Sequence, residues 1–118
     1  MYRILIAGLM FVSATGFAQT PEGVTRGSPM TSFTTHKTSD VFAQCVIDAV
    51  KTEFPASRIE PVTAGHQILI SRAPSTDVVA VIDIRDGELP RTSMVTIRSA
   101  SAAQPRKDPT VRSARNCQ

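Results

Sequence analysis

The sequence predicts an α+β fold, in which one amphipathic helix packs on an antiparallel meander of three or four strands. Two observations carry this prediction. Residues 40–54 hold apolar side chains at the spacing of an α-helix, whereas the four runs that follow are short and rich in β-branched residues. The loops between these runs are too short for the crossover that parallel neighbours require, so we expect antiparallel strands.

The predicted helix comes from the segment SDVFAQCVIDAVKTEF. Ser39 or Asp40 supplies an oxygen that caps its first turn, and Pro55 ends it. Cys45 falls within the apolar stripe, so we expect its sulfur to face the core. The stripe consists of Val41, Phe42, Cys45, Val46, Ala49 and Val50.

The predicted strands are the runs RIEPVT, HQILISR, VVAVIDIR and SMVTIRSA, which are separated by turn-forming residues. In the third run, alternate residues belong to opposite faces of the sheet. The face assigned to the core carries Val78, Ala80, Ile82 and Ile84. The other face carries Val79, Val81, Asp83 and Arg85, so we expect it to be partly exposed and able to contact a partner.

Residues 1–18 have the features of a secretory signal peptide. Arg3 precedes an apolar run, and the small residues Gly16 and Ala18 suit a signal peptidase that cuts before Gln19. A membrane anchor is the alternative, but small and polar residues interrupt the run before it reaches the ~20 residues that a span needs. We therefore expect a periplasmic or secreted protein without a membrane span after cleavage.

Cleavage would leave about 100 residues, enough for one domain. Residues 19–38 are rich in Thr, Ser, Gly and Pro and show no sustained period, so a flexible leader is predicted there. Residues 39–118 form the single predicted α+β domain, which ends in a basic segment.

The chain has two cysteines, Cys45 and Cys117. In an oxidising compartment, two cysteines indicate a disulfide, and closing so long a loop would stabilise the fold by about 4 kcal/mol. A reactive thiol pair or a metal site is the alternative. The cysteines are not in a C-x-x-C arrangement and no histidine lies at ligand spacing from either, so we expect no metal and no cofactor.

The C-terminal segment predicts a short helix. Asp108 is a suitable N-cap before Pro109, and Val111, Ala114 and Cys117 then recur every three residues. Such a helix would carry Cys117 to Cys45. The alternative is a disordered tail that only the two sulfur atoms tether.

Positive charge is concentrated in residues 98–118, which hold five basic residues and one acidic residue. The candidate binding residues there are Arg106, Lys107, Arg112 and Arg115. A basic patch attracts an acidic protein, lipopolysaccharide phosphates or anionic lipid heads, whereas a solvated surface without a partner is the alternative. Specific nucleic-acid binding is not predicted, because only three phenylalanines remain after cleavage to stack on bases.

Candidate catalytic residues are sparse. A Ser-His-Asp site can be drawn from His66, Asp83 and one of the serines, but no G-x-S-x-G motif supports it. Asp83, Asp86 and Glu88 are explained as polar residues of a solvated hairpin. The sequence has no P-loop and no G-x-G-x-x-G motif, so no enzymatic activity is predicted.

The chain has a layout similar to that of small uncharacterised envelope proteins of Gram-negative bacteria: a signal peptide, a helix cysteine in VFAQCVIDAV, a meander and a terminal cysteine in RSARNCQ. The resemblance covers residues 39–118 and implies no catalytic residue. Many members carry a lipid-anchor cysteine near the cleavage site. This chain lacks one, so the resemblance does not imply anchoring here.

The sequence therefore predicts an exported, non-enzymatic module that binds an envelope or secreted protein, as an accessory, inhibitor or immunity-type partner. The predicted contact surface combines the sheet residues Val79, Val81 and Met94 with the four basic tail residues. One alternative is a small thiol or hydrolytic enzyme, which requires an accessible cysteine or His66 in a cleft. The other is a module that binds anions such as lipopolysaccharide.

Overall fold

The computed structural model describes residues 29–72, 77–100 and 104–118. The predicted signal peptide and residues 19–28 of the predicted leader lie outside the described residues. The elements, in chain order, are β1 (Thr31–Thr35), α2 (Ser39–Val50), β2 (Arg58–Val62), β3 (Gly65–Ser71), β4 (Val78–Asp86), β5 (Ser93–Ser99), the 3₁₀ turn η1 (Pro105–Lys107) and α3 (Pro109–Asn116). No helix in these three segments is long and apolar enough to cross a membrane.

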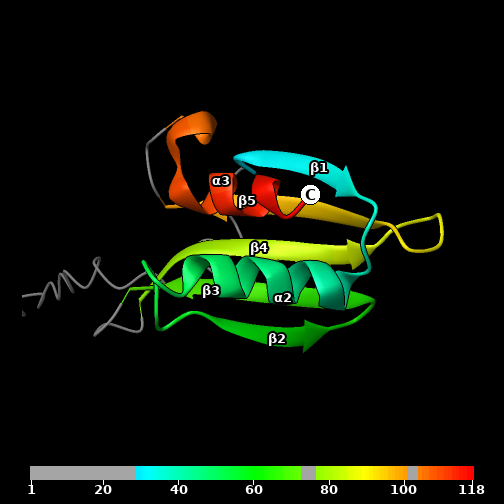
Figure 1. Cartoon of the computed structure of the whole chain (residues 1–118), viewed down its shortest axis with the longest axis horizontal. Coiled ribbons are helices and arrows are strands. Elements are labelled where there is room, and N and C mark those ends of the chain that lie inside the picture. The colour runs from blue at the N-terminus through cyan, green and yellow to red at the C-terminus, as the bar shows by residue number, and fades with distance from the viewer. Residues whose placement is uncertain (1–28, 73–76, 101–103) are drawn as a thin grey trace, which may run out of the picture.

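The strands form one antiparallel sheet in the order β1-β5-β4-β3-β2 (Figure 1). Strands β2 to β5 follow one another in the sheet and form the predicted meander. The predicted count of three or four strands is wrong, because β1 adds a fifth strand beside β5. It comes from TSFTT, within the predicted leader, where Phe33 is the single apolar residue to signal a strand.

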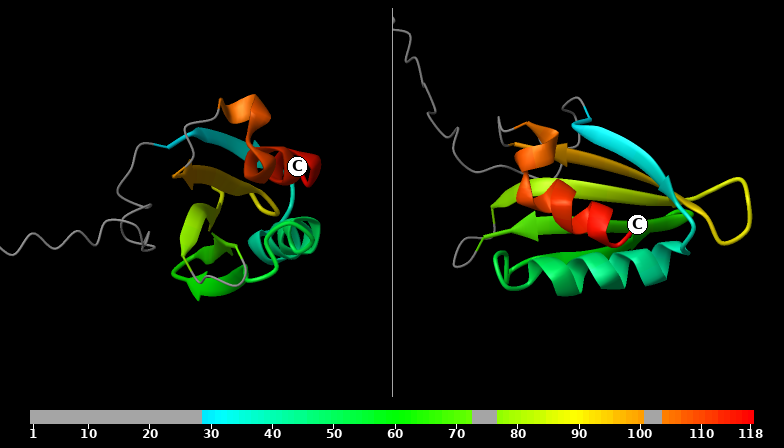
Figure 2. Two further views of the ribbon diagram at one scale, coloured as in Figure 1. Left: turned by 90° about the vertical axis from the view of Figure 1, so that its left-hand side faces the viewer. Right: turned by 45° about the horizontal axis from the view of Figure 1, so that its top comes forward.

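Both helices lie on one face of the sheet, as the end-on view of Figure 2 shows. The core fills the space between the helices and the sheet. There the rings of Phe33 and Phe42 pack edge to face, with their centres 6.1 Å apart. The buried side chains of α2 are Ser39, Phe42, Ala43, Val46, Ile47 and Val50. Val41, assigned to the apolar stripe, is instead 53% exposed, and α2 ends at Val50, one turn before the predicted end.

The predicted C-terminal helix is confirmed as α3. The Asp108 carboxylate accepts hydrogen bonds from the Thr110 and Val111 amides, at 2.8 and 3.2 Å, and Pro109 occupies the first turn. The predicted disulfide is also confirmed: Cys45 in the middle of α2 is bonded to Cys117 at the end of α3, with the two Cα atoms 5.9 Å apart. The C-terminal segment is thus part of the folded body.

An irregularity at the start of β4 changes the predicted faces of two valines. Ala80 pairs with Ile70 but Val78 pairs with Ser71, so Val79 has no opposite residue on β3. As a result Val79 packs against the core beneath the helices. Val78 belongs instead to a small buried cluster with Leu69 and Val81 on the opposite face. The faces predicted for Val78 and Val79 were therefore wrong, whereas Ala80, Ile82 and Ile84 lie in the core as predicted.

Candidate functional site

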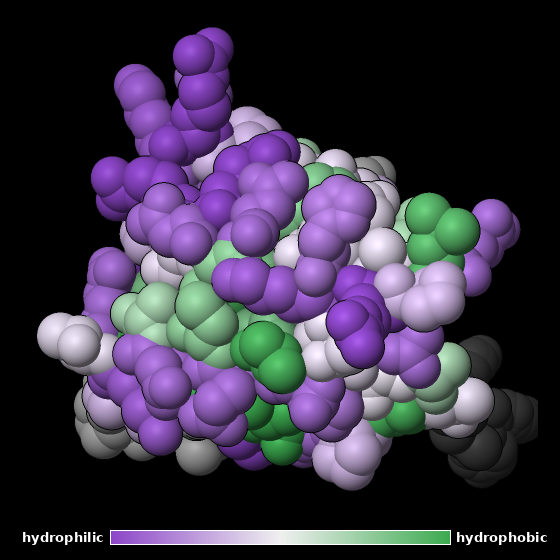
Figure 3. All heavy atoms as spheres, turned by 45° about the vertical axis from the view of Figure 1, so that its right-hand side comes forward, coloured by the Kyte–Doolittle hydropathy of each residue, from purple (hydrophilic) through white to green (hydrophobic). Residues whose placement is uncertain are grey.

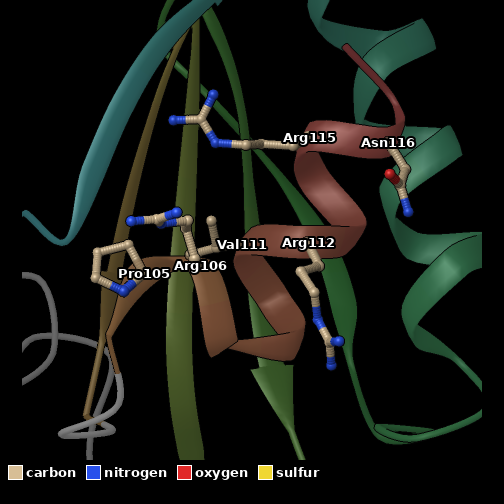
Figure 4. A pocket seen from close by; sticks show the side chains of 6 residues that line it. All are labelled: Pro105, Arg106, Val111, Arg112, Arg115 and Asn116. Carbon is tan, nitrogen blue, oxygen red and sulfur yellow. The ribbon is translucent and has the colours of Figure 1, made fainter.

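The main candidate site is a pocket of about 340 Å³ beside α3, which we call the arginine pocket (Figure 4). All its lining residues come from η1 and α3: Pro105, Arg106, Val111, Arg112, Arg115 and Asn116. Three of the four basic residues singled out in the sequence therefore line one pocket. The fourth, Lys107, is exposed on η1 and does not line it.

Local sequence explains why these residues line one pocket. Arg112 and Arg115 are three residues apart, which places them on neighbouring positions of one helix surface. The turn that brings Arg106 next to α3 is fixed by Asp108, whose buried carboxylate caps α3 and also accepts a hydrogen bond from the Ser99 hydroxyl at 3.2 Å. The pocket therefore depends on one buried acidic residue.

Arg115 is tied to the edge strand β1. Its guanidinium donates a hydrogen bond to the Thr31 hydroxyl at 3.1 Å and lies over the Phe33 ring, 5.0 Å from the ring centre. In Figure 4 the side chains of Arg106 and Arg115 extend towards β1, whereas those of Arg112 and Asn116 point away from it. One arginine of the pocket thus contacts an edge strand of the sheet.

The positive charge of the arginine pocket is not neutralised by neighbouring residues. No carboxylate is among its lining residues, and none of its arginines forms an ion pair within the described part of the chain. Guanidinium groups bind carboxylates and phosphates through paired hydrogen bonds. Such a pocket can therefore attract and orient an anionic group.

The predicted contact surface is not continuous in the structure. The arginines lie on the helix-covered side of the sheet. Val79 lies on the same side but packs against the core. Val81 is buried on the opposite face, where Met94 is 55% exposed. The structure therefore does not bring the three sheet residues together with the basic tail.

Met94 belongs to a second pocket, of about 230 Å³, which we call the methionine pocket. Its residues are Thr34, His36, Gly87, Glu88, Leu89, Thr92 and Met94. Leu89, at the tip of the β4–β5 hairpin, is 68% exposed, and sequence reasoning missed it because the DGELPRT turn is mostly polar. Figure 3, which brings the right-hand side of Figure 1 forward, shows hydrophobic surface among hydrophilic side chains.

The structure does not assemble the Ser-His-Asp site considered in the sequence. Asp83 faces away from the helices, where Gln67 and Arg98 donate hydrogen bonds to its carboxylate, each at 3.1 Å. His66 lies on the helix side, where its Nδ1 is 2.9 Å from the Ser39 hydroxyl. Ser39 is nearly buried in the first turn of α2, and neither residue lines a pocket described above.

The described residues also provide neither a free thiol nor a cluster of metal ligands. Both cysteines are in the disulfide, so neither offers a thiol. Among the described residues, no three potential metal-ligating side chains come together. The Thr38 hydroxyl and the Val41 amide hydrogen-bond the Asp40 carboxylate and lower its pKa, as expected for an acidic residue that begins a helix.

The chain matches no protein-family model, no curated protein and no solved structure. The resemblance to small envelope proteins therefore stays a prediction.

Proposed function

We propose that this protein is an exported, disulfide-closed binding module that recognises an acidic protein partner through the arginine pocket. It acts as an accessory, inhibitor or immunity-type partner and not as an enzyme. The observation that carries this proposal is the set of three arginines around one pocket of about 340 Å³, for which the described residues supply no neutralising carboxylate. The disulfide is consistent with an oxidising compartment.

The rigidity of α3 supports a role in binding. Asp108 caps its first turn, the disulfide holds its end, and the Lys37 ammonium donates a hydrogen bond to the Cys117 carbonyl at 2.6 Å. A surface fixed before binding loses less conformational entropy when the partner arrives. The backbone that carries Arg112 and Arg115 is therefore largely fixed in the free protein.

A labelled poly-glutamate peptide is a suitable probe of this proposal. The variant in which Arg106, Arg112 and Arg115 are all changed to Gln should bind it at least about tenfold more weakly at low salt, because each charge-assisted hydrogen bond contributes about 1.5 kcal/mol or more. Fluorescence anisotropy measures the affinity. The matched control changes the exposed Lys51, Arg58 and Arg91 to Gln, which removes the same charge elsewhere.

Equal losses in the two triple variants would show that net charge, and not the pocket, attracts the peptide. Binding to vesicles that contain lipopolysaccharide, without binding to poly-glutamate, would favour the anion-binding alternative. Either result would refute an acidic protein partner at the arginine pocket.

A further inference from the structure

We propose that the partner adds an extended strand to the edge of β1 that pairs with no other strand among the described residues. Its acidic side chains face the arginine pocket, and its apolar side chains face the methionine pocket. This inference rests on the proposed function, because it takes the partner to be acidic, and it adds the mode of binding and the sequence pattern of the bound segment.

The two edges of the sheet differ in their ability to pair with another strand. The edge strand β2 carries an exposed Arg58, the acidic Glu60 and an exposed Pro61, which lacks an amide hydrogen. Charges and proline on an edge strand discourage pairing with a further strand. The sequence of β1 has neither a charge nor a proline, so its edge is the one suited to strand addition.

On the helix side, an added strand would lie next to the arginine pocket. Neighbouring strands lie about 4.8 Å apart, and alternate side chains of the added strand would stand beside Thr31 and Phe33. Arg115 already contacts both of these residues, and the side chain of Arg106 extends in the same direction (Figure 4). Carboxylates at these positions would meet guanidinium groups.

On the opposite face, the added strand would pass the methionine pocket. Thr34 of β1 pairs with Met94 and lines this pocket, together with the exposed Leu89. The pocket also contains Glu88, which disfavours a second carboxylate there. The intervening side chains of the added strand should therefore be apolar, and the bound segment should alternate acidic and apolar residues.

A second copy of this chain is a less suitable occupant of the edge. Antiparallel pairing of two β1 strands into a continuous sheet would place the helix-bearing faces on the same side. The arginine pockets of the two copies would then lie near each other, and like charges would oppose the contact. The charge of the pocket favours an acidic segment instead.

The probe is a short peptide of alternating glutamate and valine. When it binds, amide hydrogen exchange measured by NMR should slow at about half of residues 31–35, because alternate amides of an edge strand point outwards, and exchange in β2 should not change. Two peptides methylated on alternate backbone nitrogens, in opposite phases, should differ. One should lose at least about tenfold in affinity and the other should bind as the parent does.

A pair of exposed-residue variants tests the methionine pocket. Met94→Glu should weaken the alternating peptide about tenfold and leave poly-glutamate binding less affected. The control is Val41→Glu, because Val41 is almost as exposed, at 53% against 55%, but lies on α2. Equal effects of the two variants on the alternating peptide would overturn the assignment of its apolar side chains.

The outcomes separate this inference from the proposed function. If the arginine variants abolish peptide binding but exchange at β1 is unchanged, or both methylated peptides bind equally, strand addition is wrong and the acidic partner stands. Strand addition is also wrong, with the acidic partner unaffected, if poly-glutamate binds and the alternating peptide does not. If the arginine variants bind both peptides as the unmodified protein does, the proposed function fails and the inference fails with it.

Discussion

Reducing the disulfide between Cys45 and Cys117 should lower the free energy of unfolding by about 4 kcal/mol. The bond joins residues separated by 72 positions, and the entropy that a cross-link removes from the unfolded chain grows with the logarithm of that length. Small domains have a total stability of about 5–15 kcal/mol, so the loss would take away a large part of it.

Urea unfolding of the oxidised and reduced protein, followed by circular dichroism, measures this difference. The sequence is identical in both forms, and a double variant with Ala at both cysteines shows whether new thiol contacts matter. Cys117 is buried, so Ala is preferable to Ser, whose hydroxyl would need a partner. A loss below about 1 kcal/mol, with an unchanged dependence on urea, would refute the loop-closure argument.

Three further predictions concern single residues. Asp108→Ala should lower the free energy of unfolding, measured in urea, by about 1–2 kcal/mol, because the Thr110 and Val111 amides lose their acceptor. The control variant Asp48→Ala, at an exposed position, should change this free energy little. Equal effects of the two variants would contradict the role of Asp108 as a helix cap. Gly65→Ala should cost about 1–3 kcal/mol, because a Cβ atom there would overlap the Ile84 carbonyl oxygen, and an unchanged melting temperature would contradict this. Asp40→Asn should lower stability near neutral pH, because a carboxyl whose pKa is lowered in the fold stabilises it above the ordinary carboxyl pKa. That difference should disappear as the pH falls through the folded-state pKa, and a difference that grows in acid would show that the direction is wrong.

Local signals account for the parts of the fold that the sequence predicted. Asp108 followed by Pro109 predicted the start of α3, and short turns predicted the meander. β1 was missed because its strand pattern is polar and its pairing partner, β5, is far away in the chain. Val79 was placed on the wrong face because one unmatched residue reverses the alternation, and the sequence of β4 does not mark it.

The sequence singled out the basic residues that line the arginine pocket, but not how the fold arranges them. The excess of basic residues near the C-terminus identified Arg106, Arg112 and Arg115, and helical spacing explains why they gather. Which face of the sheet α3 covers depends on tertiary contacts of Val111 and Ala114 with the core. A charge count contains no information on that choice, so it could not show that Val81 and Met94 lie on the face of the sheet opposite to the arginines.

The position of β1 in the sheet also determines when the chain can complete its fold. β1 is formed by the first described residues, but its partner β5 begins at Ser93, and Cys45 must wait for Cys117. The pairing of β1 with β5 must wait until the chain up to Ser99 has left the ribosome, and the disulfide must wait for Cys117. When only the residues up to Ser99 have emerged, the strands can pair but the disulfide cannot form. Protease resistance should therefore rise sharply only when Cys117 has also emerged.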